Sequence, residues 1–181
     1  TPELAVYYPT ACLVTGFVTE VTGGTDLLVT KITSSGDLDT SFGPGGTVSI
    51  DLGLNERGAG IALDSNGKIY VAGTARSNDA TTQKIVLARR FPNGLSDGGF
   101  GTLGQLVTAG PDDVCSDLIV DSLDRPTVRG RRESGILLLR TNGGGIPDPV
   151  FGGTGLVVRN PSHCTAPRRN SRPGKNRPRR N

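Results

Sequence analysis

The sequence predicts an all-β chain built from three tandem units of four strands, and three observations predict it. The motif G-x-x-D-x-x-F-G occurs three times, and one repeat corresponds to one supersecondary unit. Short apolar runs rich in Val, Ile and Leu alternate with Gly, Asn, Asp and Pro, as in strands joined by turns. No segment has sustained helical spacing, and 27 glycines disfavour long helices.

The motif places a glycine, an aspartate, a phenylalanine and a second glycine at the same spacing in every copy. Its positions are Gly36, Asp39, Phe42 and Gly43, then Gly94, Asp97, Phe100 and Gly101, then Gly145, Asp148, Phe151 and Gly152. Three of the 5 phenylalanines of the chain therefore occupy the same place in the repeat.

The repeat extends well beyond the motif. Residues 4–6 and 14–16 recur twice at a constant step of 57 positions, without a gap. The third copy is shorter within the polar stretch equivalent to 74–83, where a solvated loop tolerates a deletion. We expect a domain of residues 1–158 with units at about 3–52, 60–109 and 117–158.

Each unit is expected to contain four short strands. The first two strands form a hairpin, which is clearest at Ser65-Asn66-Gly67-Lys68. An Asn-Gly pair between apolar runs favours a tight turn, because both central residues can adopt positive φ. The third strand follows the loop at 74–83, and the motif leads into the fourth strand.

The motif side chains are open to a functional and a structural interpretation. The aspartates could bind a cation such as calcium, but each copy supplies one repeated carboxylate where calcium requires six to eight oxygens. The alternative is a turn in which the carboxylate binds the backbone two residues on. For the phenylalanines, packing between neighbouring units is favoured over stacking on a ligand.

At these residues the sequence resembles a known repeat family. The run GDLDTSFG from Gly36 to Gly43, followed by ALDSNGKIYVAG from Ala62 to Gly73, is similar to the delta-60 repeat of bacterial proteins. The resemblance covers residues 3–158 and is weaker in the third copy, where Arg125-Pro126-Thr127 replaces the usual sequence. It implies a β-propeller-like or related β-repeat architecture on an exported protein, located at the cell surface, outside the cell or in the periplasm. It supplies no catalytic residues.

Three propeller-like blades are too few for a closed ring, which typically has about four to eight. The chain begins with Thr1 and contains no Met, so we expect a fragment of a larger exported bacterial protein. Self-association, in which two copies complete one propeller, is the second expectation. An open or incomplete array of blades is the third.

The charge of the chain divides at the end of the repeats. The net charge of +3 consists of −5 in residues 1–158 and +8 in residues 159–181. The basic segment 159–181 is rich in Arg, Pro and Asn, and such a composition predicts disorder. It lacks aromatic residues for base stacking, so binding to nucleic acid is not favoured.

The sequence contains no recognisable catalytic, cofactor-binding or metal-binding motif, so an enzyme and a bound cofactor are not expected. The leading hypothesis is a non-catalytic binding or scaffold module that contacts an unknown ligand or protein through blade loops such as 74–83. A structural or adhesive surface segment is one alternative, and a hydrolase acting on glycans is another. No apolar stretch is long enough to predict a membrane span.

Overall fold

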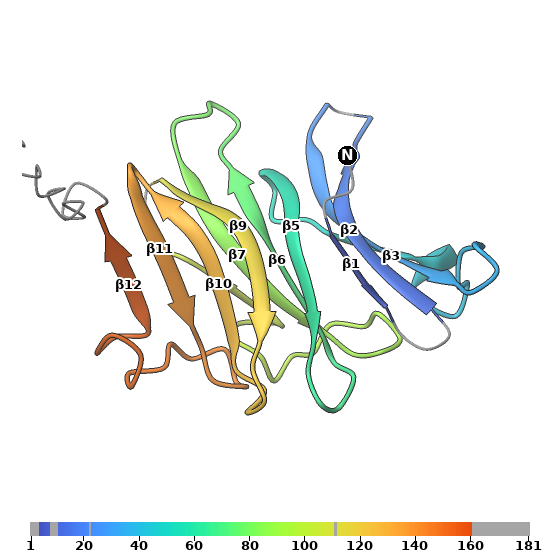
Figure 1. Ribbon diagram of the computed structural model, residues 1–181. Coiled ribbons are helices and arrows are strands. Elements are labelled where there is room, and N and C mark those ends of the chain that lie inside the picture. Colours follow the sequence, from blue (N-terminus) through green and yellow to red (C-terminus); the bar gives the residue numbers. More distant parts are fainter. Residues whose placement is uncertain (1–3, 8–10, 22, 111, 161–181) are drawn as a thin grey trace, which may run out of the picture.

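The computed structural model describes residues 4–7, 11–21, 23–110 and 112–160. This part of the chain is all-β and contains no α-helix, which confirms the predicted fold class. None of its helices is long and apolar enough to cross a bilayer. Figure 1 shows β12 and β11 at one end of the described part, β5–β7 in the middle and the β1–β3 group at the other end.

Twelve strands lie within the described residues, and we group them into three units. Unit one contains β1 (Leu4–Tyr7), β2 (Ala11–Thr19), β3 (Thr25–Thr33) and β4 (Thr47–Ile50), with a short 3₁₀ turn at Pro44–Gly46. Unit two contains β5 (Asn55–Leu63), β6 (Ile69–Arg76), β7 (Gln83–Arg90) and β8 (Gln105–Val107). Unit three contains β9 (Asp113–Val120), β10 (Pro126–Arg132), β11 (Gly135–Arg140) and β12 (Leu156–Arg159).

Within each unit, every strand pairs antiparallel with the next strand of the chain. A parallel contact between Thr25 and Asn55 joins units one and two into an eight-stranded sheet, whereas unit three is a separate four-stranded sheet. An equivalent isolated bridge joins Gln83 to Asp112 at the next boundary. The units therefore follow one another by the same local geometry, and the described strands do not close into a barrel.

The first strands of units two and three begin before the expected starts of those units. β5 begins at Asn55 and β9 at Asp113, ahead of the expected starts at 60 and 117. Both strands begin with polar residues and continue past a β-bulge, so their apolar pattern is interrupted. The last strand extends to Arg159, which the sequence had placed in the basic tail. Residues 161–181 of that tail lie outside the described part.

The Asn-Gly hairpin is present, but its turn differs from the expected one. Gly67 has a φ of 73°, whereas Asn66 is not among the residues with positive φ. The backbone N–H groups of Asn66 and Lys68 both donate to Oδ1 of Asp64, at 2.9 Å. The aspartate side chain therefore fixes the turn, and only one position requires the left-handed conformation.

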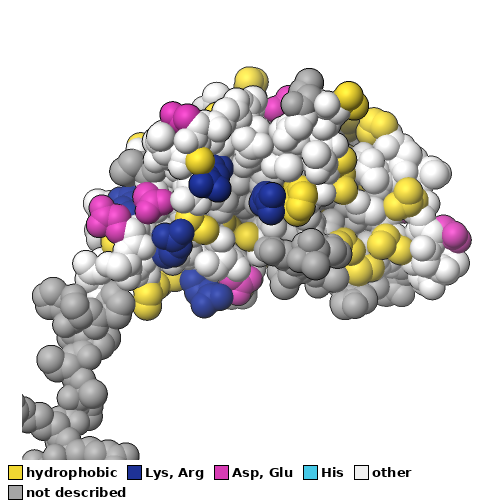
Figure 2. Space-filling view, turned by 90° about the horizontal axis from the view of Figure 1, so that it is seen from above, with side chains coloured by type: hydrophobic (Ala, Val, Ile, Leu, Met, Phe, Trp, Pro, Cys, Tyr) yellow, Lys and Arg dark blue, Asp and Glu magenta, His cyan; other side chains and the backbone are white. Residues whose placement is uncertain are grey.

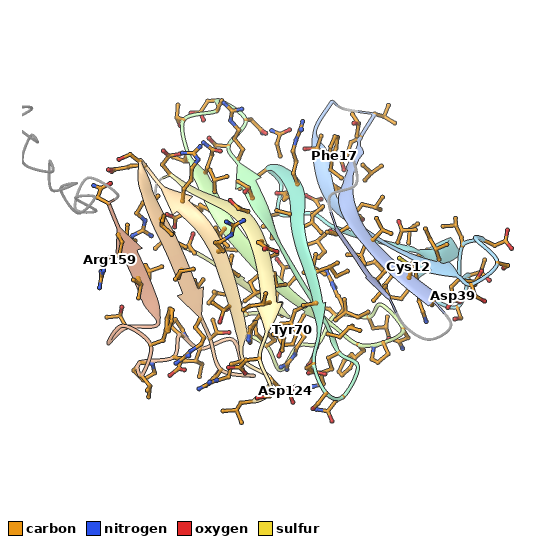
Figure 3. All side chains as sticks on the ribbon, in the orientation of Figure 1. Cys12, Phe17, Asp39, Tyr70, Asp124 and Arg159 are labelled. Atoms are coloured by element: carbon orange, nitrogen blue, oxygen red, sulfur yellow. The ribbon has the colours of Figure 1, made fainter. Side chains whose placement is uncertain are left out.

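The core lies between the units. Alternate residues of β6 point to opposite faces of the sheet, so Ile69 and Val71 pack against unit one, and Tyr70 and Ala72 pack against unit three. All four side chains are completely buried. Tyr70 lies in the middle of the molecule, between the strands of units two and three (Figure 3). The middle unit is thus buried on both faces.

Candidate functional site

The motif aspartates form the turns that the structural interpretation required. Oδ1 of Asp39 accepts the backbone N–H of Ser41 at 3.1 Å, and Oδ1 of Asp97 accepts that of Gly99 at 3.1 Å. Oδ1 of Asp148 accepts the N–H of Val150 at 3.0 Å. The same Asx-type turn therefore occurs in all three copies.

Each motif aspartate also forms an ion pair that the sequence analysis missed. The pairs are Lys31–Asp39 at 3.0 Å, Arg89–Asp97 at 2.8 Å and Arg140–Asp148 at 2.9 Å. The basic residue lies eight positions before the aspartate in every copy, so the repeat alignment contained the signal. These carboxylates are neutralised within their own unit.

The pKa values of these carboxylates agree with the pairing. The Ser41 hydroxyl and then Lys31 lower the pKa of Asp39 to about 2. Burial by itself raises the pKa of Asp97, but hydrogen bonds from Lys68, Gly99 and Arg89 outweigh it, and the pKa is lowered. Both groups are ionised and paired at neutral pH, which favours a structural role.

The burial of the three motif phenylalanines depends on whether a further unit follows. Phe42 and Phe100 are completely buried in the clusters between units one and two and between units two and three. The ring of Phe100 meets that of Tyr70 edge to face, with centroids 5.6 Å apart. Phe151 is partly exposed and lies under the Arg140 guanidinium, 4.5 Å from the ring centroid.

The motif glycines connect each unit to the next. The N–H of Gly43 donates to the carbonyl of Asn93 at 3.0 Å, and the N–H of Gly101 donates to that of Gly144 at 2.8 Å. The last glycine of one motif thus binds the residue that precedes the first glycine of the following motif. We call this repeated contact the glycine lock.

The first glycine of a motif lets the preceding unit approach closely. A Cβ atom on Gly94 would lie 3.2 Å from Cε2 of Phe42. A Cβ on Gly145 would lie 2.7 Å from the backbone nitrogen of Gly101 and 3.1 Å from Cε2 of Phe100. At Gly36, which has no preceding unit in this chain, nothing lies within 4 Å.

We predict that Gly145→Ala destabilises the chain by about 2–4 kcal/mol, and Gly36→Ala by only about 1 kcal/mol. Both glycines have φ near 90°, at 80° and 91°, so both variants include the strain of a left-handed alanine. Only Gly145→Ala adds overpacking against fixed backbone. Urea unfolding of the two variants measures the difference, and equal losses would contradict the close packing of unit two against Gly145.

We call the side of a unit that points toward the next unit its leading face. The residues of this face are buried in units one and two but not in unit three. In units one and two, the equivalent leading residues are completely buried: Leu13, Leu27, Val29 and Phe42, then Tyr70, Ile85, Leu87 and Phe100. In unit three the same positions are Thr127, Ile136, Leu138 and Phe151, and none of them is buried. Ile136 is 54% exposed.

The trailing face, toward the preceding unit, shows the reverse pattern. In units two and three its residues are buried: Ile69, Val71, Val86 and Ala88, then Pro126, Val128, Leu137 and Leu139. In unit one the same positions are Cys12, Val14, Leu28 and Thr30, and all are partly exposed. The described part therefore has two end faces whose equivalents are buried between units, and these two faces form the candidate interface.

The view from above shows how these faces are arranged. The described part has an arched outline, and visible hydrophobic side chains gather on the side of unit one (Figure 2). Most of the visible lysine, arginine and acidic side chains lie on the side of unit three. On this face, the two ends of the described part therefore expose different kinds of side chain.

The loop expected at 74–83 is shorter than its sequence suggested. β6 continues to Arg76 and β7 begins at Gln83, so only residues 77–82 connect them. Asp79 accepts hydrogen bonds from the hydroxyls of Ser77 and Thr81, at 2.6 and 2.8 Å. The polar residues that suggested a binding loop are used to hold the loop together.

Comparison with known proteins does not assign the chain to a family. No protein-family model matches it, and no curated protein matches it either.

Proposed function

We propose that the chain is a non-catalytic scaffold module of propeller-like blades, whose two end faces bind further units of the same kind. The three units are taken as three blades of an open propeller of the delta-60 type. In this proposal the chain belongs to a larger exported bacterial protein at the cell surface or in the periplasm. The faces between blades, rather than a pocket, are its binding surfaces.

The observation that carries the proposal is the change in burial at equivalent positions. Leading residues that are buried in units one and two are partly or largely exposed in unit three, and trailing residues that are buried in units two and three are partly exposed in unit one. Stacked repeats require their end faces to be covered. A unit with the same motif has both the shape and the polarity to cover them.

A second copy of the chain can cover both end faces, because its unit one can pack on unit three of the first copy and its unit three on unit one. Unit three of one copy offers Phe151 and Gly152, the positions whose equivalents bind the next unit. Unit one of the other copy offers Gly36, where nothing lies within 4 Å of an added Cβ atom. At the equivalent Gly94 and Gly145, a phenylalanine of the preceding unit fills this space. Two copies joined in this way contain six units, within the range of about four to eight blades found in propellers.

The non-catalytic part of the proposal rests on the use of the acidic residues in the motif. Asp39, Asp97 and Asp148 are each paired with a cation of their own unit. Catalytic carboxylates are typically held with unmatched or raised pKa values in a cleft. The lowered pKa values of Asp39 and Asp97 are those of structural ion pairs.

Sedimentation velocity of residues 1–181 between about 1 and about 200 μM tests the proposal. We expect the chain to self-associate, and Ile136→Lys or Leu28→Lys to weaken the association, because each variant places a charge on one end face. Leu123→Lys is the matched control, since Leu123 is 68% exposed in a hairpin outside both faces.

The control should self-associate like the unmodified chain. A single-chain mass for all four proteins over this range, with unchanged unfolding, would contradict self-association through the end faces.

A further inference from the structure

Three carboxylates from different strands converge at one end of unit one. Glu20 follows β2, Asp26 lies in β3, and Asp51 follows β4. One oxygen from each lies within 4.8 Å of the other two. Calcium binds oxygen at about 2.3–2.6 Å, so two oxygens on one ion can be at most about 5 Å apart. The three carboxylates meet that condition.

A fourth carboxylate is buried beside them. Glu56 in β5 is completely buried, and its Oε1 accepts the backbone N–H of Leu54 at 3.1 Å. Its Oε2 has no partner of good hydrogen-bond geometry among the described residues, although the backbone N–H of Leu52 also lowers the pKa of this carboxyl. The Glu56 carboxylate interacts electrostatically with those of Asp51 and Asp26, so its negative charge lies close enough to act on the cluster without being one of the three converging carboxylates. An unpaired buried charge of this kind is strongly unfavourable.

The residue equivalent to Glu56 at the boundary between units two and three has a cationic partner that Glu56 lacks. Asp113, 57 residues after Glu56, is also completely buried. Arg132 donates to both of its carboxylate oxygens, at 2.6 and 2.9 Å. The residue equivalent to Arg132 in unit two is Ala75. No described lysine or arginine is ion-paired with Asp26, Asp51 or Glu56.

Electrostatic repulsion within the cluster affects its protonation. Burial raises the pKa of Asp26, and Glu20 and Asp51 raise it further. Burial also raises the pKa of Glu56, with further increases from Asp51 and Asp26. The neighbouring carboxylates therefore oppose the ionisation of Asp26 and Glu56, whereas the pKa of Asp113 beside Arg132 is lowered.

We propose that Glu20, Asp26 and Asp51 bind a calcium ion and that the buried carboxylate of Glu56 adds to the charge that holds it. All candidate ligands are oxygens, which suit a hard cation, and the site lacks the His and Cys ligands of zinc. An adjoining pocket of about 560 Å³, lined by Asn55 and Asn78 as well as Glu20 and Asp51, has room for water ligands. The positive charge of the ion would compensate the negative charge of Glu56, as Arg132 compensates that of Asp113 at the next boundary.

The test is thermal unfolding of residues 1–181 in EDTA and in calcium, at constant ionic strength. Calcium at about 100 times its dissociation constant should raise Tm by about 5–10 °C. Asp51→Asn should abolish this rise, and because Asp51 is exposed, that variant should fold. Glu56→Gln should raise Tm in EDTA and reduce the response to calcium, because it removes a buried unpaired charge.

Asp113→Asn is the matched control: it should lower Tm in both buffers and keep the full calcium response. Isothermal titration calorimetry should give one calcium ion per chain. An unmodified chain with the same Tm in EDTA and in calcium would overturn the proposal. So would a rise that sodium reproduces at equal ionic strength, or one that persists in Asp51→Asn. This proposal does not depend on self-association, which sedimentation measures separately.

Discussion

Phe100→Ala is expected to lower the free energy of unfolding by about 3–5 kcal/mol, the usual cost of removing a buried aromatic ring. Phe100 is completely buried between units two and three, where its ring contacts Tyr70 edge to face. Its loss leaves a cavity at the boundary, with the Arg89 guanidinium 5.1 Å from the former ring centre. Urea unfolding followed by circular dichroism measures the change.

Phe151→Ala is the matched control, because it changes the same motif position in the unit that no further unit follows. Phe151 is partly exposed and contacts Arg140, so its removal should cost roughly 1 kcal/mol in the isolated chain. The comparison requires a dilute sample, since self-association would bury Phe151 as well. Equal losses for the two variants would show that position in the motif, rather than the following unit, determines the contribution of the ring.

The sequence predicted the features that the repeat determines locally. The all-β class follows from short apolar runs and glycine-rich turns, and each motif aspartate forms the turn its spacing suggested. The buried places of Phe42 and Phe100 agree with packing between units. Each of these features depends either on residues close together in one copy or on a residue type that recurs at the same position in every copy.

The parts that the sequence did not predict depend on which side chains meet on neighbouring strands. Glu56 and Asp113 are equivalent positions, but the partner of Asp113 is Arg132 on a neighbouring strand, whereas Glu56 faces carboxylates of the preceding unit. A comparison of single positions cannot show which side chains meet on neighbouring strands. The early start of β5 was missed for a related reason, because polar residues at Asn55 and Glu56 interrupt the apolar pattern.

Arg132→Met should be the second strongly destabilising change, with a loss of about 3 kcal/mol at pH 7. The variant keeps most of the side-chain volume but leaves Asp113 as a buried, unpaired charge. The loss should be at the lower end of the range for buried pairs, because the Arg132 side chain is 27% exposed. Arg131→Met is the matched control, since Arg131 is 50% exposed and 3.9 Å from Asp112, and it should change stability by less than about 0.5 kcal/mol.

The pH dependence of this loss separates lost charge pairing from lost packing. Burial alone raises the pKa of Asp113, but Arg132 and Thr108 outweigh it, so the pKa in the native chain is lowered. The pair therefore stabilises the native chain above the unfolded pKa of about 3.9, and this stabilisation is lost only as the pH falls through the lower folded pKa. In Arg132→Met burial dominates and the pKa is raised, so protonation relieves the buried charge as the pH falls. The difference from the native chain should be smaller at pH 5 than at pH 7 in urea titrations, whereas a loss of packing alone would be the same at both.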